Sequence, residues 1–312
     1  MTSTRSCPVC GEQNSEMLFQ TKDSPGRISR CLNCRMVYVD YIIDRHALIF
    51  DGPVIYDKIT QKMLTSSNLN DVKDTWEFSY LLPVKEVEWP ALRQNALNAL
   101  QRIECHINKP FDECKILDFG SGWGFFLAAA KENGWNPFGL EPLPASSIYA
   151  RAKFGLNIVT DTLREKTFPP AFFDAITSFQ VFEHLPYPDK DIQHLHKSLR
   201  PGGIILIEVP NFETWTMWLL KSRHRHFSQD HLNFFSAATL DRFLTSHGFR
   251  VVEKYHPARI MSIRHLIKYW FPRYLPVFFA EALEKSLLKT SISNRTIRLN
   301  IGDIVTVIAR KL

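Results

Sequence analysis

The sequence predicts an α/β fold, in which a mostly parallel sheet is covered by helices and a small cysteine-rich module precedes it. Apolar runs of strand length alternate with stretches of helical periodicity between 116 and 255, which is the pattern of repeated βαβ units. A glycine-rich bend directly follows the first of these runs, and two Cys-x-x-Cys pairs stand within the first 40 residues. A chain of 312 residues with 45% apolar composition can form one large domain and a small appendage.

Residues 1–40 contain the cysteine pairs Cys7/Cys10 and Cys31/Cys34. Four thiolates at this spacing can close a tetrahedral site, and zinc is the ion that such four-cysteine sites hold. Thiol pairs of this kind also favour a reducing compartment over disulfides. We therefore predict a zinc ribbon over 1–40 with a structural role, because four protein ligands leave no coordination position open for chemistry.

Residues 41–110 are predicted to form a helical lead-in that caps the main domain, 111–312. Apolar residues recur at helical spacing over 91–107 after Pro90, which predicts a long helix. The aromatic residues that precede this helix have two interpretations: they cover the mouth of the ligand site, or they seal the ribbon against the main domain.

The most informative stretch is 116–142, ILDFGSGWGFFLAAAKENGWNPFGLEP. A predicted strand ends in Asp118, glycines follow at 120, 122 and 124, a helix is predicted over 125–133, and a second strand over 137–140 ends in Glu141. Glycines in the first turn of a βαβ unit let the backbone approach a nucleotide-like ligand closely. A dinucleotide fingerprint would have its third glycine one residue later. Asp118 would repel a pyrophosphate but suits a cationic ligand such as S-adenosylmethionine, and Glu141 can accept the ribose hydroxyls.

Further strands and helices follow in alternation. Predicted helices cover 145–154 and 189–199, and predicted strands cover 156–159, 172–179 and 204–209. The strand over 172–179 is apolar, as buried parallel strands are, and Gln180-Val-Phe-Glu183-His184 follows it. The strand over 204–209 begins after Leu-Arg-Pro-Gly-Gly.

The bend D-F-G-S-G-W-G with L-E-P, and the later blocks F-D-A-I-T-S-F-Q-V-F-E-H-L and L-R-P-G-G, resemble the class I S-adenosylmethionine-dependent methyltransferases in content and order. The resemblance implies a Rossmann-like sheet over 111–312, mostly parallel with an antiparallel last strand. It also implies cofactor contacts at the ends of the first four strands. The predicted cofactor-binding residues are Asp118, Gly120, Ser121, Gly122, Gly124, Glu141, Pro142, Asp161, Thr162 and Gln180.

The last part of the chain predicts a helix over 237–247 with Ser236 as its N-cap, a strand over 249–255 and a final strand over 303–310. Between these strands, 259–298 is predicted to be a basic, aromatic helical insertion. It carries eight Lys and Arg against two Glu, which equals the whole net charge of +6. Such a helix can cover the active site, make a peripheral contact with an anionic membrane or form a homodimer interface, and all three alternatives remain open.

Methyl transfer is an in-line displacement that often requires a base to deprotonate the acceptor. Glu183 and His184 follow the strand over 172–179, at the edge where open α/β sheets bind ligands. We predict that His184 is the general base with Glu183 as its partner, and His231 is a second candidate. The alternative is that His184 only shapes the loop before Pro186.

The acceptor is predicted from resemblance alone. Quinone-precursor O-methyltransferases carry E-x-x-E-H, which binds a divalent metal, but Gln180 replaces the first acid here and an amide is a poor ligand for a hard cation. A four-cysteine ribbon with the E-H pair resembles sugar and natural-product methyltransferases, although the large C-terminal domain of the sugar enzymes is not found here. We expect a small-molecule acceptor of glycan, nucleotide-sugar or secondary metabolism. A lipid-linked or quinone-like acceptor and a non-catalytic cofactor-binding scaffold are the alternatives.

Two function classes are disfavoured. The excess of positive charge lies in one segment, and the N-P-P-Y type tetrad is missing after the strand over 172–179, so we expect no nucleic-acid partner. The chain shows no N-terminal apolar signal region and no uncharged apolar run of about 18 residues. We therefore expect a cytoplasmic protein, with a peripheral position at the inner membrane surface as the alternative that 259–298 leaves open.

Overall fold

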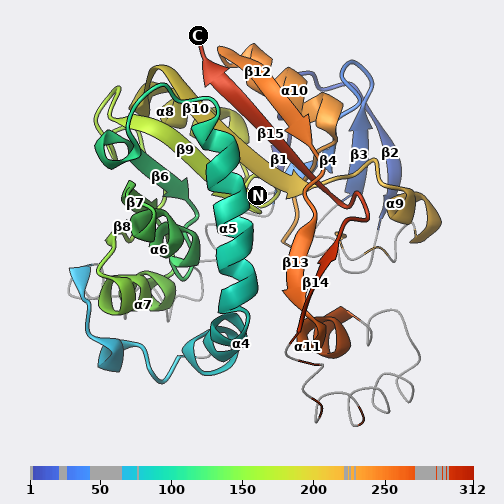
Figure 1. Cartoon of the computed structure of the whole chain (residues 1–312). Helices are drawn as coiled ribbons and strands as arrows, with labels where there is room; N and C mark the ends of the chain where they lie inside the picture. Colours follow the sequence, from blue (N-terminus) through green and yellow to red (C-terminus); the bar gives the residue numbers. More distant parts are fainter. Residues whose placement is uncertain are drawn as a thin grey trace.

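The structure is a computed structural model that describes residues 3–20, 27–42, 65–75, 77–220, 230–270 and 295–312, together with the single positions 224, 226, 227, 286, 290 and 293. Its centre is a seven-stranded sheet in the order β12-β15-β10-β9-β6-β7-β8 (Figure 1). The strands are β6 (Lys115–Phe119), β7 (Asn136–Leu140), β8 (Asn157–Val159), β9 (Phe173–Phe179), β10 (Leu199–Pro210), β12 (Phe249–Tyr255) and β15 (Ile304–Lys311).

Only β15 runs against its neighbours in this sheet, since it pairs antiparallel with both β10 and β12 while all the other pairs from β10 to β8 are parallel. The predicted mostly parallel sheet with an antiparallel last strand is therefore confirmed. Because all the strands from β6 to β10 point the same way, the polar residues predicted to follow them gather at one edge of the sheet.

The two faces of the sheet follow from the period-2 alternation of strand side chains. Leu117, Ile176 and Ile207 share one core with α8 (Pro188–Ser198) and α10 (Ala237–Ser246). Their neighbours along the strands share the other core with α5 (Trp89–Glu104) and α6 (Phe125–Glu132). α7 (Pro144–Phe154) follows β7. The cap predicted for α10 is confirmed, because the Ser236 hydroxyl accepts a hydrogen bond from the Thr239 amide.

The lead-in consists of short helical segments and the long helix α5. The short segments are η1 (Leu69–Asp71), η2 (Glu77–Leu81) and α4 (Leu82–Val87). α5 begins at Trp89 rather than at 91 and has Pro90 in its first turn, where the missing proline amide costs no hydrogen bond. Two of the aromatic residues that precede α5 in the sequence, at 56 and 76, lie outside the described residues, so their predicted contacts are not tested.

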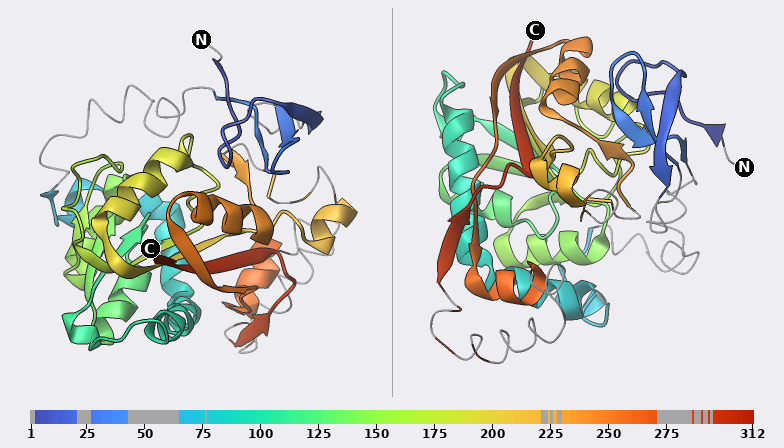
Figure 2. Two further views of the ribbon diagram at one scale, coloured as in Figure 1. Left: turned by 90° about the horizontal axis from the view of Figure 1, so that it is seen from above. Right: turned by 90° about the vertical axis from the view of Figure 1, so that its right-hand side faces the viewer.

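The N-terminal module forms a four-stranded sheet in the order β11-β4-β3-β2. Its strands are β2 (Ser15–Gln20), β3 (Arg27–Cys31), β4 (Val37–Val39) and β11 (Asn233–Phe234), and a further pair joins β1 (Ser3–Thr4) to β5 (Tyr41–Ile42). β11 belongs to the main domain by sequence, so the two modules share a sheet. Cys7, Cys31 and Cys34 also lie in the same core as α8 and α10. The ribbon and α5 thus stand on opposite sides of the central sheet (Figure 2).

The predicted helical insertion at 259–298 has to be corrected at both ends. β13 (Arg259–Ser262) and β14 (Thr296–Leu299) form an antiparallel pair beside α5, with α11 (Ile263–His265) and η5 (Leu266–Trp270) after β13. Thr-Ile-Arg-Leu in β14 alternates polar with apolar side chains, which suits a strand with one packed face. The part of the predicted basic helix that falls on 271–285 lies outside the described residues.

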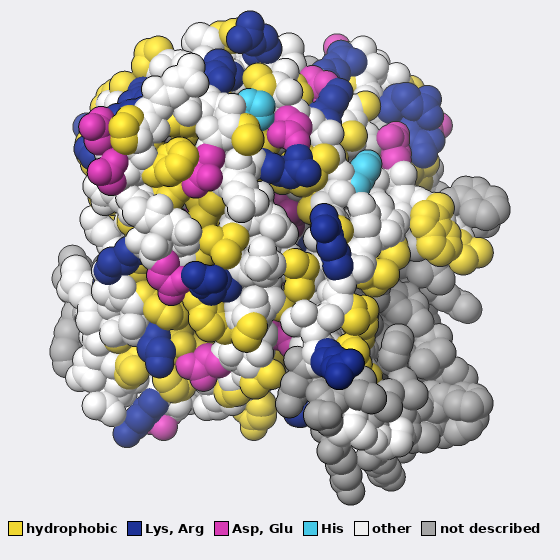
Figure 3. All heavy atoms as spheres, viewed as in Figure 1, with side chains coloured by type: hydrophobic (Ala, Val, Ile, Leu, Met, Phe, Trp, Pro, Cys, Tyr) yellow, Lys and Arg dark blue, Asp and Glu magenta, His cyan; other side chains and the backbone are white. Residues whose placement is uncertain are grey.

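β13 is tied to α5 by polar side chains. Asn95 exchanges two hydrogen bonds with the backbone of Ile260, and the buried Glu88 carboxylate accepts bonds from the amide and hydroxyl of Ser262. On the face shown in Figure 3, Lys and Arg side chains stand among acidic and apolar ones rather than in one continuous tract. No helix in the described ranges combines the length and the apolarity that a membrane span requires.

Candidate active site

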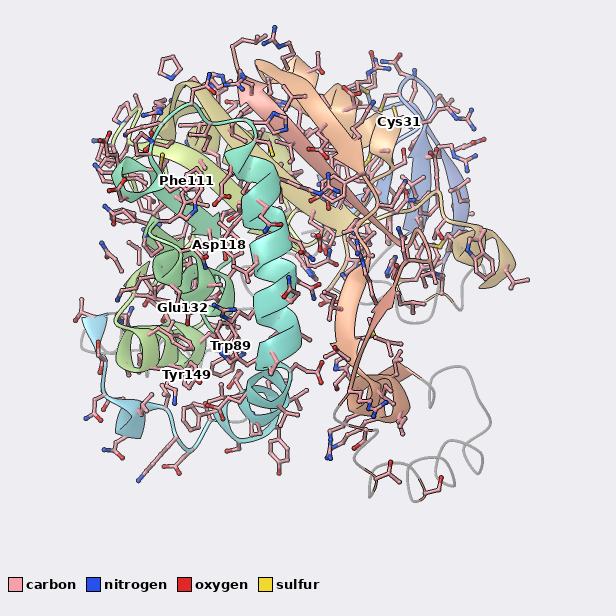
Figure 4. The ribbon with its side chains drawn as sticks, viewed as in Figure 1. Cys31, Trp89, Phe111, Asp118, Glu132 and Tyr149 are labelled. Atoms are coloured by element: carbon pink, nitrogen blue, oxygen red, sulfur yellow. The ribbon has the colours of Figure 1, made fainter. Side chains whose placement is uncertain are left out.

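Asp118 lies near the carboxyl end of β6, at the edge of the sheet where a ligand is expected (Figure 4). Its side chain is buried, with 3% of the residue exposed, and it accepts a 2.8 Å hydrogen bond from the Thr177 hydroxyl of β9. Burial, aided by the charge of Glu141 and opposed by the Thr177 bond, raises the pKa of Asp118 to about 8. A buried carboxyl of this kind would ionise readily when a cationic ligand binds beside it.

The glycine bend is fixed by the packing around it. Gly120, Gly122 and Gly124 have φ angles of +80°, +50° and +77°, which side-chain-bearing residues rarely adopt. A Cβ atom on Gly120 would lie 2.4 Å from Val181 Cγ2, and one on Gly124 would lie 2.7 Å from Ala150 Cβ. A Cβ atom on Gly122 would meet nothing within 4 Å among the described residues, so this glycine faces open space.

Glu141 closes the bend from the end of β7. Its Oε2 accepts a 2.7 Å bond from the Gly122 amide, and its Oε1 accepts a 2.8 Å bond from the Leu143 amide. Burial raises the pKa of Glu141 to about 7, against the effect of these two bonds. A carboxylate has about four acceptor positions, so both oxygens retain capacity for the hydroxyls of a ribose.

The other predicted cofactor residues lie at the same edge. Asp161 and Thr162 follow β8, and Asp161 Oδ1 accepts bonds from the Thr162 amide and from Arg164. Gln180 follows β9 with φ +57°, and its amide donates to the Glu208 carbonyl. The Ser121 hydroxyl is buried against Gly139, and Pro142 stands beside the Glu141 carboxylate. The roles of these residues toward the cofactor remain predictions.

The lead-in covers the glycine bend. Val72 and Leu82 share a small core with Trp123 of the bend and with Tyr149 of α7, and the Tyr149 hydroxyl donates to Glu86 at 2.7 Å. Trp89, labelled in Figure 4, packs against Phe125 with ring centroids 5.2 Å apart. Of the two interpretations of the lead-in aromatics, the described ones favour the cover over the ligand site.

Glu183, His184 and His231 meet beside the bend, on the loop after β9 and the segment before β11. One ligand atom from each residue lies within 4.8 Å of the others, and the two imidazole centroids are 4.7 Å apart. His184 Nδ1 lies 2.9 Å from the Asp230 carbonyl, and His184 Nε2 lies 4.0 Å from Glu183 Oε1. The contact of Val181 with Gly120 brings this loop against the predicted cofactor site.

Glu183 is 1% exposed, and neither of its carboxylate oxygens has a hydrogen-bond partner among the described residues. Burial raises the pKa of Glu183 to about 8, with further contributions from Glu208 and Asp230 and an opposing one from Arg259. A buried acid without partners is costly, so Glu183 is a candidate to bind a ligand or a protonated imidazole. Glu183, His184 and His231 also offer a donor set for a divalent cation.

The four predicted ribbon ligands come together. The four Sγ atoms all lie within 4.8 Å of one another. The Sγ atoms of Cys7 and Cys34 are 3.4 Å apart, and those of Cys10 and Cys31 are 3.5 Å apart. Burial raises the pKa of the Cys7 thiol well above its ordinary value and that of Cys34 to about 11. Thiolates there need a cation to offset burial, and a buried set of four cysteines fits zinc.

A family model for a methyltransferase domain matches residues 87–254, more than half of the chain. The chain belongs to the S-adenosylmethionine-dependent methyltransferases. A probable S-adenosylmethionine-dependent methyltransferase of Mycolicibacterium smegmatis is 28% identical over 137 residues, which cover 44% of this chain and 52% of the relative. The ubiquinone biosynthesis O-methyltransferase of Idiomarina loihiensis is 30% identical over 132 residues, 39% of this chain and 53% of the relative.

The methyltransferase therefore matches about half the length of these curated relatives. A chain of the complex between the Haloferax volcanii Trm112 methyltransferase activator and a methyltransferase aligns with a TM-score of 0.50 at 17% identity, covering 73% of this chain and 92% of that one. At this identity the likeness concerns the fold, and it agrees with the strand order described above.

Sequence reasoning missed several residues of the site. Thr177 supports Asp118, and Glu208 and Arg259 lie near Glu183. Asn233 contacts the loop that carries His184, and Arg5 contacts Asn233. Among them, Asn233 lies two residues from the predicted His231. The others come from strands or from the N-terminus and reach the site through the tertiary fold.

The raised pKa of Asp118 predicts that S-adenosylmethionine binds with release of a proton. Binding a cation favours the ionised carboxyl, so affinity should rise as pH increases toward 8, by up to about tenfold per pH unit for one proton. Asp118→Asn should weaken binding by roughly 10- to 100-fold and flatten this dependence. Calorimetry of both proteins at pH 6 to 8, with the exposed Asp112→Asn as the control, measures the effect. The same dependence of affinity on pH in wild type and Asp118→Asn would contradict the predicted proton release.

The cysteine cluster predicts one tightly bound zinc ion per chain. Cys10→Ser should reduce the zinc measured by mass spectrometry of the purified protein and lower its thermal midpoint, because the metal contributes directly to folding. Cys114→Ser, at a buried thiol outside the cluster, is the matched control and should retain the metal. A wild-type protein that stays free of zinc after expression with added zinc would refute the assignment.

Proposed function

We propose that the methyltransferase transfers a methyl group to a small-molecule acceptor that His184 deprotonates. The observation that carries the proposal is the cluster of Glu183, His184 and His231, which lies against the glycine bend through Val181. When bound between Asp118 and Glu141, S-adenosylmethionine supplies the electrophilic methyl group. The protein's task is then to hold the acceptor near that group and to remove its proton.

The hydrogen bonds around His184 assign the nitrogen that acts as base. A carbonyl can only accept, so the 2.9 Å contact of Nδ1 with the Asp230 carbonyl places the hydrogen on Nδ1. Nε2 is then unprotonated and can take a proton from the acceptor. The Glu183 carboxyl lies 4.0 Å from Nε2, and its ionised form would stabilise the imidazolium that results. The acceptor's proton would then rest on Nε2, beside the buried Glu183 side chain.

The acceptor proposal rests on polar groups beside this pair. Glu208 is half-buried, with 16% of its side chain exposed, and desolvation raises its pKa. The Gln180 side chain donates to it, and the Arg259 guanidinium lies 3.9 Å from its carboxylate. Such a set of donors and acceptors suits a hydroxyl-rich acceptor of glycan, nucleotide-sugar or secondary metabolism better than a hydrocarbon. A quinone-like acceptor is the alternative, supported by the named activity of the Idiomarina relative. A peripheral membrane contact or a homodimer through 259–298 would accompany that alternative.

A second mechanism, metal-assisted activation of the acceptor, is favoured by one observation. The ligand atoms of Glu183, His184 and His231 are close enough to bind one divalent cation. Removal of weakly bound metal by EDTA, followed by addition of Mg²⁺ or Mn²⁺, decides between the two: activity that depends on the added ion supports metal assistance, and unchanged activity supports His184 as the base.

The role of His184 predicts a separation of binding from turnover. His184→Asn should lower the rate of S-adenosylhomocysteine formation by about 10² to 10⁴-fold and leave the affinity for S-adenosylmethionine within about twofold. The measurement is a screen of nucleotide sugars, polyols and phenols for S-adenosylhomocysteine release, followed by kinetics on the active acceptor. His247→Asn, at the C-terminal end of α10, is the control. Full activity of His184→Asn would rule out the proposed base.

The raised pKa of Glu183 predicts a pH-dependent effect on stability. An acid whose folded pKa of about 8 exceeds the unfolded value contributes stability that is complete below about pH 4.5 and is lost as pH rises through 8. Glu183→Gln removes that loss. The free energy of unfolding of the variant, relative to that of wild type, should therefore increase by at least about 1 kcal/mol from pH 5 to pH 9. Urea unfolding at both pH values tests this, and a constant difference between the two proteins would argue against the burial described here.

A further inference from the structure

Strand β11 lies between the ribbon and the loop that carries His184. On one edge it pairs with β4, where Asn233 stands opposite Tyr38 and the Val39 amide donates to the Leu232 carbonyl at 2.9 Å. On the other edge, the amides of Leu232 and Asn233 donate to the Glu183 carbonyl at 2.6 and 3.0 Å. This short segment is therefore bonded to the ribbon and to the predicted catalytic loop at the same time.

The side chain of Asn233 strengthens this connection. It is buried, with 1% of the residue exposed, and its amide nitrogen donates to the carbonyls of Phe182 and Leu185 at 2.7 and 2.8 Å. These two carbonyls flank the Glu183-His184 pair. One side chain thus fixes the backbone on both sides of the predicted base.

Arg5 holds Asn233 from the ribbon side. Its guanidinium donates to Asn233 Oδ1 at 2.7 Å and to the Leu232 carbonyl at 3.3 Å. The Arg5 backbone amide in turn donates to the Asp40 carbonyl at 2.7 Å, and Cys7 follows two residues later. The oxygen and the nitrogen of Asn233's side-chain amide are therefore both used, the oxygen toward the ribbon and the nitrogen twice toward the loop.

The part of the active site predicted to bind S-adenosylmethionine, the methyl donor, does not depend on these contacts. The hydrogen bonds of the Asp118 and Glu141 carboxylates come from Thr177, Gly122 and Leu143, which belong to the central sheet and its loops. The ribbon's hydrogen bonds reach residues 232–233 on the acceptor side, and these residues in turn bond to residues 182–185.

We propose that the ribbon positions the Glu183-His184 loop through the hydrogen bonds of Arg5 and Asn233, here called the Arg5–Asn233 clasp. Arg5 and Asn233 are positioning residues, and a metal ion held by the four cysteines would keep the ribbon in the form that the clasp requires. The ribbon thereby affects acceptor chemistry while leaving cofactor binding intact. The effect on turnover rests on the proposed role of His184, whereas the effect on loop order does not.

The test compares Asn233→Asp with wild type by amide hydrogen exchange, S-adenosylmethionine calorimetry and turnover. The substitution preserves shape and the acceptor for Arg5 but removes both donors to Phe182 and Leu185. Exchange in peptides spanning 181–186 and 230–235 should increase by about tenfold or more, since buried carbonyls lose their partners. kcat should fall by about 10- to 100-fold, with cofactor affinity within about twofold. Wild type treated with a zinc chelator should show the same rise in exchange in these peptides.

Arg30→Ala is the matched control, because Arg30 lies on β3 of the ribbon and has no part in the clasp. Its guanidinium lies 3.3 Å from the Glu16 carboxylate of β2. The substitution should change neither exchange nor kcat. If Asn233→Asp is unfolded and does not bind the cofactor, the same measurements on Arg5→Lys test the clasp. This variant leaves the side-chain donors of Asn233 in place. Raised exchange at 181–186 with normal cofactor affinity supports the clasp. Unchanged exchange in folded Asn233→Asp or in Arg5→Lys overturns it. Should His184→Asn remain fully active, the proposed base fails while the exchange measurement still judges the clasp.

Discussion

The hydrogen bond from the Gly122 amide to the Glu141 carboxylate is the contact on which the cofactor site depends. It joins the turn after β6 to the end of β7, so that two neighbouring strand ends form one rigid edge. The left-handed glycines allow this turn, and the packing of Val181 and Ala150 leaves no room for larger residues at 120 and 124. Asp118 is buried below the turn, where a cationic ligand would relieve the cost of its ionisation.

The acceptor side is built on a different principle. Its charged groups come from loops and the insertion rather than from strand ends alone, and the loop after β9 is held by β11 and the ribbon. A shared sheet and a shared core make the ribbon part of the methyltransferase domain. The sequence had suggested a separate structural module. The difference matters because the shared strand β11 follows His231, and its residue Asn233 bonds to the loop that carries His184.

Local patterns explain which features were predictable. The apolar runs of β6, β9 and β10 and the Ser236 cap act through nearest neighbours, so the sequence alone locates them. The glycine bend was equally clear, because its backbone angles allow few other residues. β11 was missed because two residues carry no periodicity and its partner strand is far away in the chain. Arg5 gave no signal either, since an isolated arginine acquires its role only when the ribbon folds onto the main domain. The strands at both ends of 259–298 were obscured by basic and aromatic residues that suit an amphipathic helix as well.

A crystal structure of the protein with bound S-adenosylmethionine tests the central claim most directly. The account predicts the ribose hydroxyls within hydrogen-bond distance of the Glu141 carboxylate, the cationic end beside Asp118 and the methyl group directed toward the Glu183-His184 loop. A ligand bound elsewhere, or a bend filled by side chains, would contradict it.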